Sequence, residues 1–475
     1  MTVASVVAAM LGVITFFHWT VASSGGFNPP GEEDYYNFLV RGWRNGHLYL
    51  SKAPHPTMLT LADPYEPAQN GPFRLGDASY HDGHYYLYFS AVPAVLVLWP
   101  YFLLTGRELG TTTAIFGFAV MGFLATSTLW LRLRSRYFPA SAGWLAPLGV
   151  GILGLASHVL ALQRRPLVWE LPIVTAYAFA MLALLLAHVV ITRASKAAAT
   201  AAGLCLGLAI ASRPTYVFGA IAFLPLAWWV WRREGRAGST LRCGAAGLVL
   251  CAVAVLTHNH ARFGRMLEFG QNYQVTSIYE AKAVHFSLRY IPHNLAIYGF
   301  QAPQWTRAFT FVSATVDRAG PPGYLGGWNE PVAGLALTLP FLGLAAFAPW
   351  AWRGRSPDET RVVRCELLVL SGFFVGLAGV TLAYFLSTPR YLADFTPALA
   401  LLAAIGALAL ERRVATTRIR PAVLSGIALL GCISLTMGCL LSFDYHQRML
   451  RNLWPVGWQR LEAFFAAPPS GTPPH

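Results

Sequence analysis

Long apolar runs constrain this chain more than any other feature of its sequence. Runs of about 20 residues, the length at which an α-helix crosses a bilayer, recur throughout the 475 residues. Only 12% of the residues are charged and 55% are hydrophobic, whereas soluble domains carry roughly a quarter charged residues. Membrane β-barrels are built from short segments of alternating polarity instead. The sequence therefore predicts an all-α polytopic membrane protein.

We expect about eleven membrane-spanning helices. They fall near residues 2–22, 110–131, 142–162, 170–191, 197–212, 215–231, 241–258, 331–350, 365–387, 391–410 and 421–441. One more run, 88–106, is interrupted by Pro93 and Pro100, so we predict that it lies along the membrane interface. The N-terminus is then cytoplasmic, and the inside loops hold 17 of the 35 Lys and Arg residues, as the positive-inside rule requires. If 88–106 crossed the membrane, every later loop would change sides.

This topology divides the chain into four parts. They are a membrane module (1–258) with a large outer loop (23–109), a second outer loop (259–330), C-terminal helices (331–441) and an outer tail (442–475). The first run has no basic segment before it, so we interpret it as an uncleaved helix. The net charge of +14 is spread over short loops, which argues against a nucleic-acid partner. All six cysteines lie in or beside apolar runs, so disulfides and Cys-bound metals are not expected.

Three adjacent acids open the first outer loop, in the stretch "GEEDYYNFLVRGWRNG". Asp34 is predicted to cap a helix that Gly46 ends, because apolar residues follow at helical spacing. A helix cap explains the carboxylate of Asp34 and leaves those of Glu32 and Glu33 without an explanation. Carboxylates next to a membrane segment are candidates for a functional site, although a solvated acidic cap is the alternative.

Further polar residues of the first loop suit sugar recognition. Asp77, Asp82 and Tyr86 offer carboxylates and an aromatic face in "LGDASYHDGHYYLYF". The alternative is that these residues mainly form turns, since Asp82-Gly83 is a turn signal within a predicted hairpin. In the second loop Glu268 belongs to a polar cluster that serves either substrate contact or loop packing, and His258 with His260 is a weak metal motif.

Charged residues also stand at the outer ends of predicted spans. Glu170 begins one span and follows Arg165, so it is either a favourable helix N-terminal acid or a functional residue. Arg213 and Arg390 lie at the outer level of two other spans and need an anionic partner. A lipid phosphate suits the planar guanidinium fork. The alternative pairs Arg390 with Asp394 at i, i+4 and leaves Arg213 unexplained.

Together these motifs resemble the GT-C glycosyltransferases, in the branch of protein O-mannosyltransferases and the lipid A aminoarabinose transferase. The similar features are the acidic pair, Tyr and closing Gly of "GEEDYYNFLVRGWRNG", the Pro-containing interfacial run, Arg165-Pro166 followed by Glu170, and Arg213-Pro214. The resemblance in motifs covers about residues 1–235. The remainder of the chain is similar to the family only in its predicted topology. The family pair is Asp-Glu, whereas this chain has Glu-Glu. If the acidic pairs are aligned, Tyr36 matches the family tyrosine. If Gly46 is aligned with the family glycine, Tyr35 matches it instead. Glu32 and Glu33 therefore remain alternatives for one role.

The resemblance implies a membrane glycosyltransferase that uses a polyprenyl-phosphate sugar donor and inverts the anomeric carbon. Glu32 or Glu33 would be the catalytic base, Arg213 and Arg390 would bind the donor phosphate, and Asp34, Asp77, Asp82, Tyr86, Arg165, Glu170 and Glu268 would contact substrate. The partners would be the lipid donor, a lipid, glycan or protein acceptor, and the bilayer. The family includes metal-dependent and metal-independent members, so we predict no cofactor and leave a divalent cation open.

The expected location is the bacterial inner membrane, with the site facing the periplasm. Two other functions fit parts of the pattern. A transporter or flippase of lipid-linked sugars would also need outer acids and arginines, although no internal repeat supports it. A surface-polysaccharide polymerase or ligase would depend on arginines and a histidine rather than on the acids of the first loop.

Overall fold

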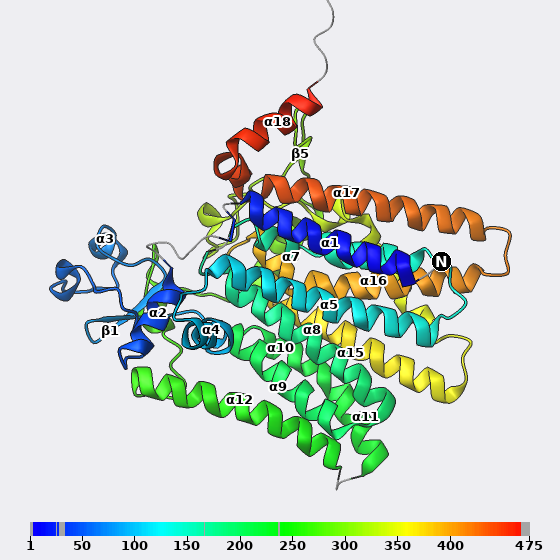
Figure 1. The fold of residues 1–475 in the computed structure, drawn as a ribbon, viewed down its shortest axis with the longest axis horizontal. Coiled ribbons are helices and arrows are strands. Elements are labelled where there is room, and N and C mark those ends of the chain that lie inside the picture. Colours follow the sequence, from blue (N-terminus) through cyan, green and yellow to red (C-terminus); the bar gives the residue numbers. More distant parts are fainter. Residues whose placement is uncertain (1–2, 25, 28–33, 166, 236–237, 467–475) are drawn as a thin grey trace, which may run out of the picture.

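Helices that lie side by side in one bundle dominate the computed structural model (Figure 1). It describes residues 3–24, 26–27, 34–165, 167–235 and 238–466. Among these residues, eight segments are long and apolar enough to cross a membrane. They are α1 (Val3–Ser23), α5 (Thr111–Tyr137), α6 (Leu145–Leu155) continued by α7 (Val159–Leu162), α8 (Glu170–Arg193), α12 (Ser239–Phe263), α15 (Pro357–Leu382), the turn η10 (Pro389–Tyr391) with α16 (Leu392–Val414), and most of α17 (Arg420–Leu453). The prediction of an all-α polytopic membrane protein is confirmed.

Three of the predicted spans take other forms. Run 197–212 is the 17-residue helix α9 (Lys196–Ser212), which packs against α8 and α12. Run 215–231 consists of α10 (Tyr216–Ala220), η3 (Ile221–Phe223) and α11 (Leu224–Glu234), and run 331–350 contains α14 (Leu335–Thr338) and the 3-10 segment η9 (Pro340–Trp352). Prolines at 225, 340 and 349 lack the N–H that a continuous α-helix needs. The count of eleven spans stays a prediction.

The centre of the bundle is α16, which is almost entirely buried. It packs against η9, α5, α6, α8, α15 and α17. Its sequence is rich in Ala and Gly, which lets neighbouring backbones come close. At Gly406 the approach is so close that an added Cβ would overlap the carbonyl group of Leu344. Small residues therefore fix α16, which carries Asp394 in its first turn and follows the turn that holds Arg390.

The first loop joins the second loop through a small sheet. The first loop contains α2 (Tyr35–Arg44), η1 (Pro56–Leu59), α3 (Pro67–Asn70), β1 (Ala78–His81), β2 (His84–Tyr86), η2 (Ala94–Leu98) and α4 (Trp99–Thr105). The second contains η4 (Gln271–Tyr273), β3 (Gln274–Val275), η5 (Glu280–Lys282), η6 (Leu288–Tyr290), α13 (Ile291–Leu295), η7 (Ala296–Phe300), β4 (Gln304–Trp305), β5 (Val312–Ser313) and η8 (Gly326–Trp328). In the sheet order β2-β1-β3, Ala78 pairs with Val275 and Ser79 with Gln274. Both loops therefore lie at the same end of the bundle.

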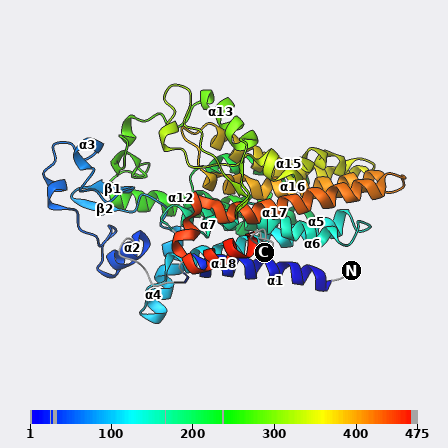
Figure 2. The same cartoon turned by 90° about the horizontal axis from the view of Figure 1, so that it is seen from above.

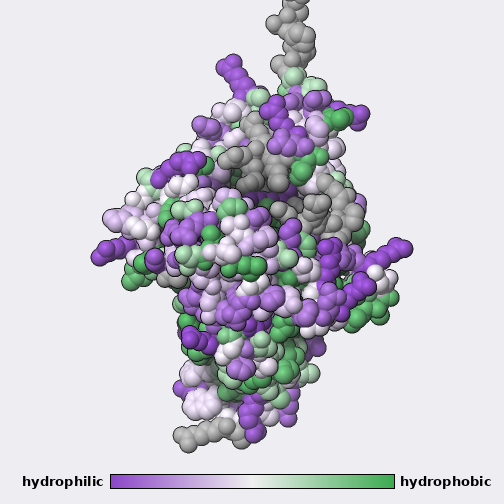
Figure 3. Space-filling view, turned by 90° about the vertical axis from the view of Figure 1, so that its left-hand side faces the viewer, coloured by the Kyte–Doolittle hydropathy of each residue, from purple (hydrophilic) through white to green (hydrophobic). Residues whose placement is uncertain are grey.

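Figure 2 shows this loop end opposite the end where the chain begins. Figure 3 looks onto the loop end, where many hydrophilic residues are interspersed with smaller hydrophobic patches. The C-terminal helix α18 (Pro455–Phe465) follows α17, and its Trp458 packs on Phe309 of the second loop. The elements that carry the candidate site are thus gathered at one end of the bundle.

The segment 88–106 forms a short helix rather than a long one. The helical part, Ala94–Thr105, rises roughly 18 Å, which is less than the ~30 Å of a bilayer core. Leu103 and Leu104 are strongly exposed, while η2, the first part of this helical segment, packs against α2. A segment of this length cannot cross the bilayer alone, and the interfacial position remains our prediction.

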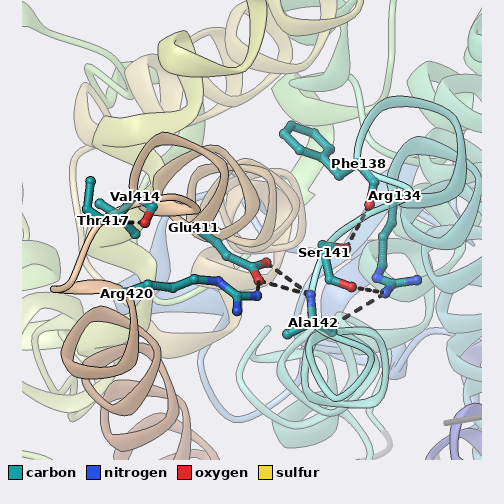
Figure 4. Close-up of polar contacts among 8 residues, drawn as sticks. All are labelled: Arg134, Phe138, Ser141, Ala142, Glu411, Val414, Thr417 and Arg420. Atoms are coloured by element: carbon teal, nitrogen blue, oxygen red, sulfur yellow. Dashed lines mark hydrogen bonds and ion pairs between the residues drawn. The ribbon is translucent and has the colours of Figure 1, made fainter.

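A buried carboxylate ties three helices together at the opposite end of the bundle (Figure 4). Glu411, near the end of α16, accepts hydrogen bonds from the backbone N–H of Ala142, before α6, and pairs with Arg420 at 2.8 Å, at the start of α17. Seventeen helical residues separate Asp394 from Glu411, a rise of roughly 25 Å. This cluster is therefore remote from the site at the loop end.

Candidate active site

Two arginines share one carboxylate where the second loop meets the start of η10 and α16. Glu330 Oε1 lies 3.0 Å from Arg165 Nη1 and 3.1 Å from Arg390 Nη1. Arg165 lies just before α8, and Arg390 lies in η10. All three side chains are at most 16% exposed, so solvent and salt screen their attraction less than at a surface. Three segments that are distant in the sequence therefore meet at one carboxylate.

The indole ring of Trp169 contacts both of these arginines. Its centroid lies 4.7 Å from the guanidinium carbon of Arg165 and 5.0 Å from that of Arg390, within cation–π range. Trp169 also hydrogen-bonds to the Asp77 carboxylate of the first loop. Trp169 thereby connects the first loop to the arginine pair.

A third arginine joins the same region from the end of α9. Arg213 Nε lies 2.8 Å from Asp394 Oδ2, in the first turn of α16. Its guanidinium carbon is 5.0 Å from the ring centroid of Tyr391, and that of Arg390 is 5.6 Å from the same ring. Tyr391 therefore brings the two arginines predicted for phosphate into one neighbourhood.

The predicted alternative pairing of Arg390 with Asp394 is wrong. Arg390 lies in the 3-10 turn η10, before α16 begins at Leu392, so the spacing of four residues is not helical spacing. Asp394 pairs with Arg213, and Arg390 pairs with Glu330. Each arginine therefore has the anionic partner that we expected it to need, and that partner is a carboxylate of the protein.

Glu170 is a fully buried carboxylate at the start of α8. Neither of its oxygens has a hydrogen-bond partner among the described residues, and its exposure is zero. It is close enough to Arg165, Arg390 and Glu330 to interact electrostatically with each. The buried hydroxyl group of Tyr36, for which the described part of the chain offers no hydrogen-bond partner, lies near the same carboxylate. The structure thus brings Glu170 and Arg165 together with Arg390, as their positions at the outer ends of spans suggested.

Asp77 has an unusual backbone conformation next to this group. Its φ angle is 60°, in the left-handed region that few non-Gly residues adopt. Its N–H donates to the carbonyl of Val275, so strand pairing with the second loop holds the turn. Burial raises the pKa of Asp77, Arg390 lowers it, and the carboxylate of Glu280 raises it again. Backbone strain supported by surrounding structure is a common feature of functional sites.

Tyrosines and an acid from several segments lie near these arginines. Tyr384 and Tyr391 stack edge to face with centroids 5.4 Å apart. Burial raises the pKa of Tyr88 above its ordinary value, with smaller contributions from Glu280 and Tyr391. Glu280 in turn lies 2.6 Å from His285. Phenol groups and carboxylates of this kind are suited to hydrogen-bonding the hydroxyl groups of a sugar.

Asp34 is a helix cap, as predicted. Its Oδ1 accepts from the backbone N–H groups of Tyr36 and Asn37, and the hydroxyl of Thr111 binds both carboxylate oxygens. These bonds connect α2 to the first residue of α5 and occupy the carboxylate, so its predicted substrate contact is not supported. The helix ends before Gly46, whose φ of +80° suits glycine. Glu32 and Glu33, the predicted catalytic residues, lie outside the described residues.

Three other predicted substrate residues are used elsewhere. Asp82 and Gly83, both with positive φ, form the tight turn between β1 and β2, and the Asp82 side chain is 84% exposed. Tyr86 packs on Phe263 and Tyr49. Glu268 accepts from Gly270 N and Asn272 Nδ2, which favours loop packing. In the described contacts none of the three reaches the arginines, so the turn interpretation was correct for Asp82.

Glu330, Trp169 and Tyr391 are the central residues that sequence reasoning missed. One signal was present for Glu330, because it directly precedes an apolar run, as Glu170 does. Trp169 and Tyr391 carried no comparable signal, since the chain has many aromatic residues near membrane ends. Within the described residues no group of three or more His, Cys, Asp or Glu side chains is placed to hold a metal ion.

Comparisons with known proteins give structural but no sequence matches. No protein-family model matches the chain, and no curated protein matches it. A crystal structure of ArnT from Cupriavidus metallidurans bound to undecaprenyl phosphate is similar, with a TM-score of 0.47, 13% identity and coverage of 96% of this chain and 78% of that one. The same protein in the apo state gives a TM-score of 0.43 at 13% identity, with coverage of 94% and 77%. The similarity extends over nearly the whole chain, while the sequences differ at most positions.

Proposed function

We propose that this protein is an integral membrane glycosyltransferase that moves a sugar from a polyprenyl-phosphate donor to an acceptor, with inversion at the anomeric carbon. The convergence of Arg165, Arg213 and Arg390 at the ends of apolar helices, beneath two joined loops, carries the proposal. Guanidinium groups fixed at a membrane boundary suit a lipid phosphate, because they bind its oxygens through charge-assisted hydrogen bonds. They also stabilise the charge that grows on the phosphate as it leaves.

The acids take the remaining steps of the reaction. Glu32 or Glu33, in the segment between α1 and α2, draws the proton from the acceptor hydroxyl or amine as the new glycosidic bond forms. Asp77 and Glu170 position the sugar or the acceptor, because both lie next to the arginines. The bond from the anomeric carbon to the phosphate oxygen breaks on the opposite face, and the electron pair goes to the lipid phosphate.

An apolar pocket beside the ion pair supports a lipid donor. It lies between α6, α7, α16, α17 and the end of the second loop, and leucines and alanines line most of it. Pro331 and Pro389 also line it, and they are the chain neighbours of Glu330 and Arg390. The lining also includes His158, Ser442 and Asp444, so this small pocket suits at most the hydrocarbon group directly next to the donor phosphate.

The positions of the basic residues give the orientation in the membrane. Arg132, Arg193, Arg232 and Arg412 lie near helix ends remote from the joined loops, and basic loops remain in the cytoplasm. The site then faces the outer side, which in a bacterial inner membrane is the periplasm.

Sugar transfer by purified, reconstituted protein tests this function. Undecaprenyl-phosphate sugars serve as donors, and mass spectrometry of co-purifying lipid guides their choice. We expect one of the single variants Glu32→Gln and Glu33→Gln to lower turnover at least about a hundred-fold. The single variants Arg213→Ala and Arg390→Ala should each have an effect of the same size. Glu66→Gln, a loop acid whose side chain does not cap its helix, is the matched control. Wild-type turnover in all four test variants contradicts the site, and lipid translocation without any transfer favours a flippase.

A further inference from the structure

Two arginines share one carbonyl oxygen at the end of the bundle opposite the joined loops. Arg355 Nε donates to the carbonyl of Ala351, in the last turn of η9, at 2.6 Å, and Arg412 Nη1 donates to the same oxygen at 3.3 Å. Arg412 also donates to the carbonyl of Gly354, and Arg355 to that of Tyr137, the last residue of α5. The two guanidinium groups are therefore close neighbours, although both are positively charged.

No carboxylate balances these two charges. Within the described residues neither arginine forms an ion pair. Glu411 directly precedes Arg412 in the chain, but its carboxylate pairs with Arg420 (Figure 4). Burial and the neighbouring Arg412 lower the pKa of Arg355, and the exposed Glu359 only partly offsets them. The pair therefore carries an excess of positive charge.

The backbone carbonyls compensate only part of this excess. The free carbonyl groups at the end of a helix together carry roughly half a negative charge. The ends of α5 and η9, which supply Tyr137 and Ala351 as acceptors, therefore offset about one of the two positive charges. A phosphodiester group carries a single negative charge and would balance the other. Its oxygens suit guanidinium N–H groups, because hydrogen bonds between charged partners are the stronger ones.

The position of the pair favours a lipid as the source of this phosphodiester. Arg412 lies in the last turn of the membrane-spanning α16, and Arg355 lies just before α15, another membrane-spanning helix. The segment that leads to the pair, η9, contains no charged residue and exposes Gly343, Ala346 and Pro349. Residues three apart in a 3-10 helix lie on the same face. An exposed apolar face therefore extends from the arginines along the bundle.

We propose that Arg355 and Arg412 form a binding site for the phosphodiester headgroup of an anionic phospholipid. The lipid supplies the negative charge that the pair lacks, and its hydrocarbon chains lie on the apolar face of η9. Basic pockets between membrane helices bind anionic headgroups in this way. The bound lipid connects the end of η9 to α16 and to the start of α15, and thereby stabilises the bundle. This site is remote from the candidate active site and does not depend on the proposed function.

Native mass spectrometry of the full-length protein with added phospholipids tests this site. Phosphatidylglycerol, which is anionic, should bind the wild type about ten-fold more tightly than phosphatidylcholine, which has no net charge. In Arg412→Gln this preference should fall at least about three-fold, because one of the two cations is removed. Arg361→Gln is the matched control, since it removes one positive charge at the same end from a residue that already pairs with Asp358. It should keep the wild-type preference.

A conservative variant and a soluble anion separate the remaining explanations. Arg412→Lys retains the charge and should keep most of the preference for phosphatidylglycerol. A large excess of inorganic phosphate should leave lipid binding unchanged, and displacement of the lipid by phosphate would overturn the proposal in favour of a soluble anion. Phosphatidylglycerol should also raise the unfolding midpoint of the wild type more than phosphatidylcholine does, and Arg412→Gln should lose this difference. Equal binding of the two lipids by the wild type, or an undiminished preference in Arg412→Gln, would overturn the proposal.

Discussion

Arg213 and Asp394 form an ion pair of 2.8 Å that connects the end of α9 to the first turn of α16. The two residues are 181 positions apart in the sequence. Asp394 is almost completely buried, and only a fifth of the Arg213 side chain is exposed. The pair therefore holds α9 and α16 together at the level of the site, and it places Tyr391 beside Arg213 and Arg390.

Removing one member of this pair should destabilise the protein. Arg213→Gln leaves a buried carboxylate without its cation, which costs about 3–5 kcal/mol in comparable buried pairs. We expect a lower midpoint of thermal unfolding in detergent, measured without added lipid. The double variant Arg213→Gln with Asp394→Asn should regain most of the loss. A double variant as unstable as the single one would show that the ion pair is not the cause.

Asp77 and Asp82 provide a matched pair of variants in one loop. Both have positive φ angles, and asparagine tolerates that conformation as aspartate does. Asp77→Asn should lower sugar transfer at least about ten-fold, because it removes a charge beside Arg390 and Trp169. Asp82→Asn should keep wild-type transfer, since the side chain is exposed at a turn. Equal effects of the two changes on transfer would contradict the placement of Asp77 in the site.

The same aspartate should make stability depend on pH. Burial raises the pKa of Asp77 above the value it has in the unfolded chain. The folded state then binds the proton more tightly, so the stability from this group is full below the unfolded pKa. It is lost as pH rises through the folded pKa. The unfolding midpoint of Asp77→Asn relative to wild type should therefore rise with pH over this interval, and a difference constant from pH 4 to 8 would refute the burial effect.

Glu411 should matter for stability and not for donor binding. Glu411→Ala leaves the Ala142 N–H and the Arg420 guanidinium without their buried acceptor (Figure 4). We expect a loss of about 2–4 kcal/mol and a lower unfolding midpoint. Asp358→Asn breaks the exposed pair with Arg361, at 91% and 70% exposure, and should change little. Weaker binding of undecaprenyl phosphate by Glu411→Ala at a temperature where it stays folded would conflict with the distance between the two ends.

Local patterns were enough to predict several elements of the loop end. The cap by Asp34 and the helix end near Gly46 are confirmed, because both depend on backbone groups a few residues away. The tight turn at Asp82-Gly83 is confirmed for the same reason. The pairing of Arg390 with Asp394 failed, since a proline-initiated 3-10 turn changed the local geometry. Spacing alone cannot distinguish that turn from the first turn of α16.

The sequence by itself determined that this chain is a bundle of apolar helices, because a continuous apolar run of about 20 residues satisfies its backbone in a bilayer as a helix, whereas barrels are built from short alternating strands. It also determined which charged residues stand at the helix ends. Only the tertiary structure decided their partners, since Glu330 meets Arg165 and Arg390 across 165 and 60 positions of the chain. Contacts over such separations depend on how α8, α16 and the second loop pack, and no short-range pattern encodes that packing.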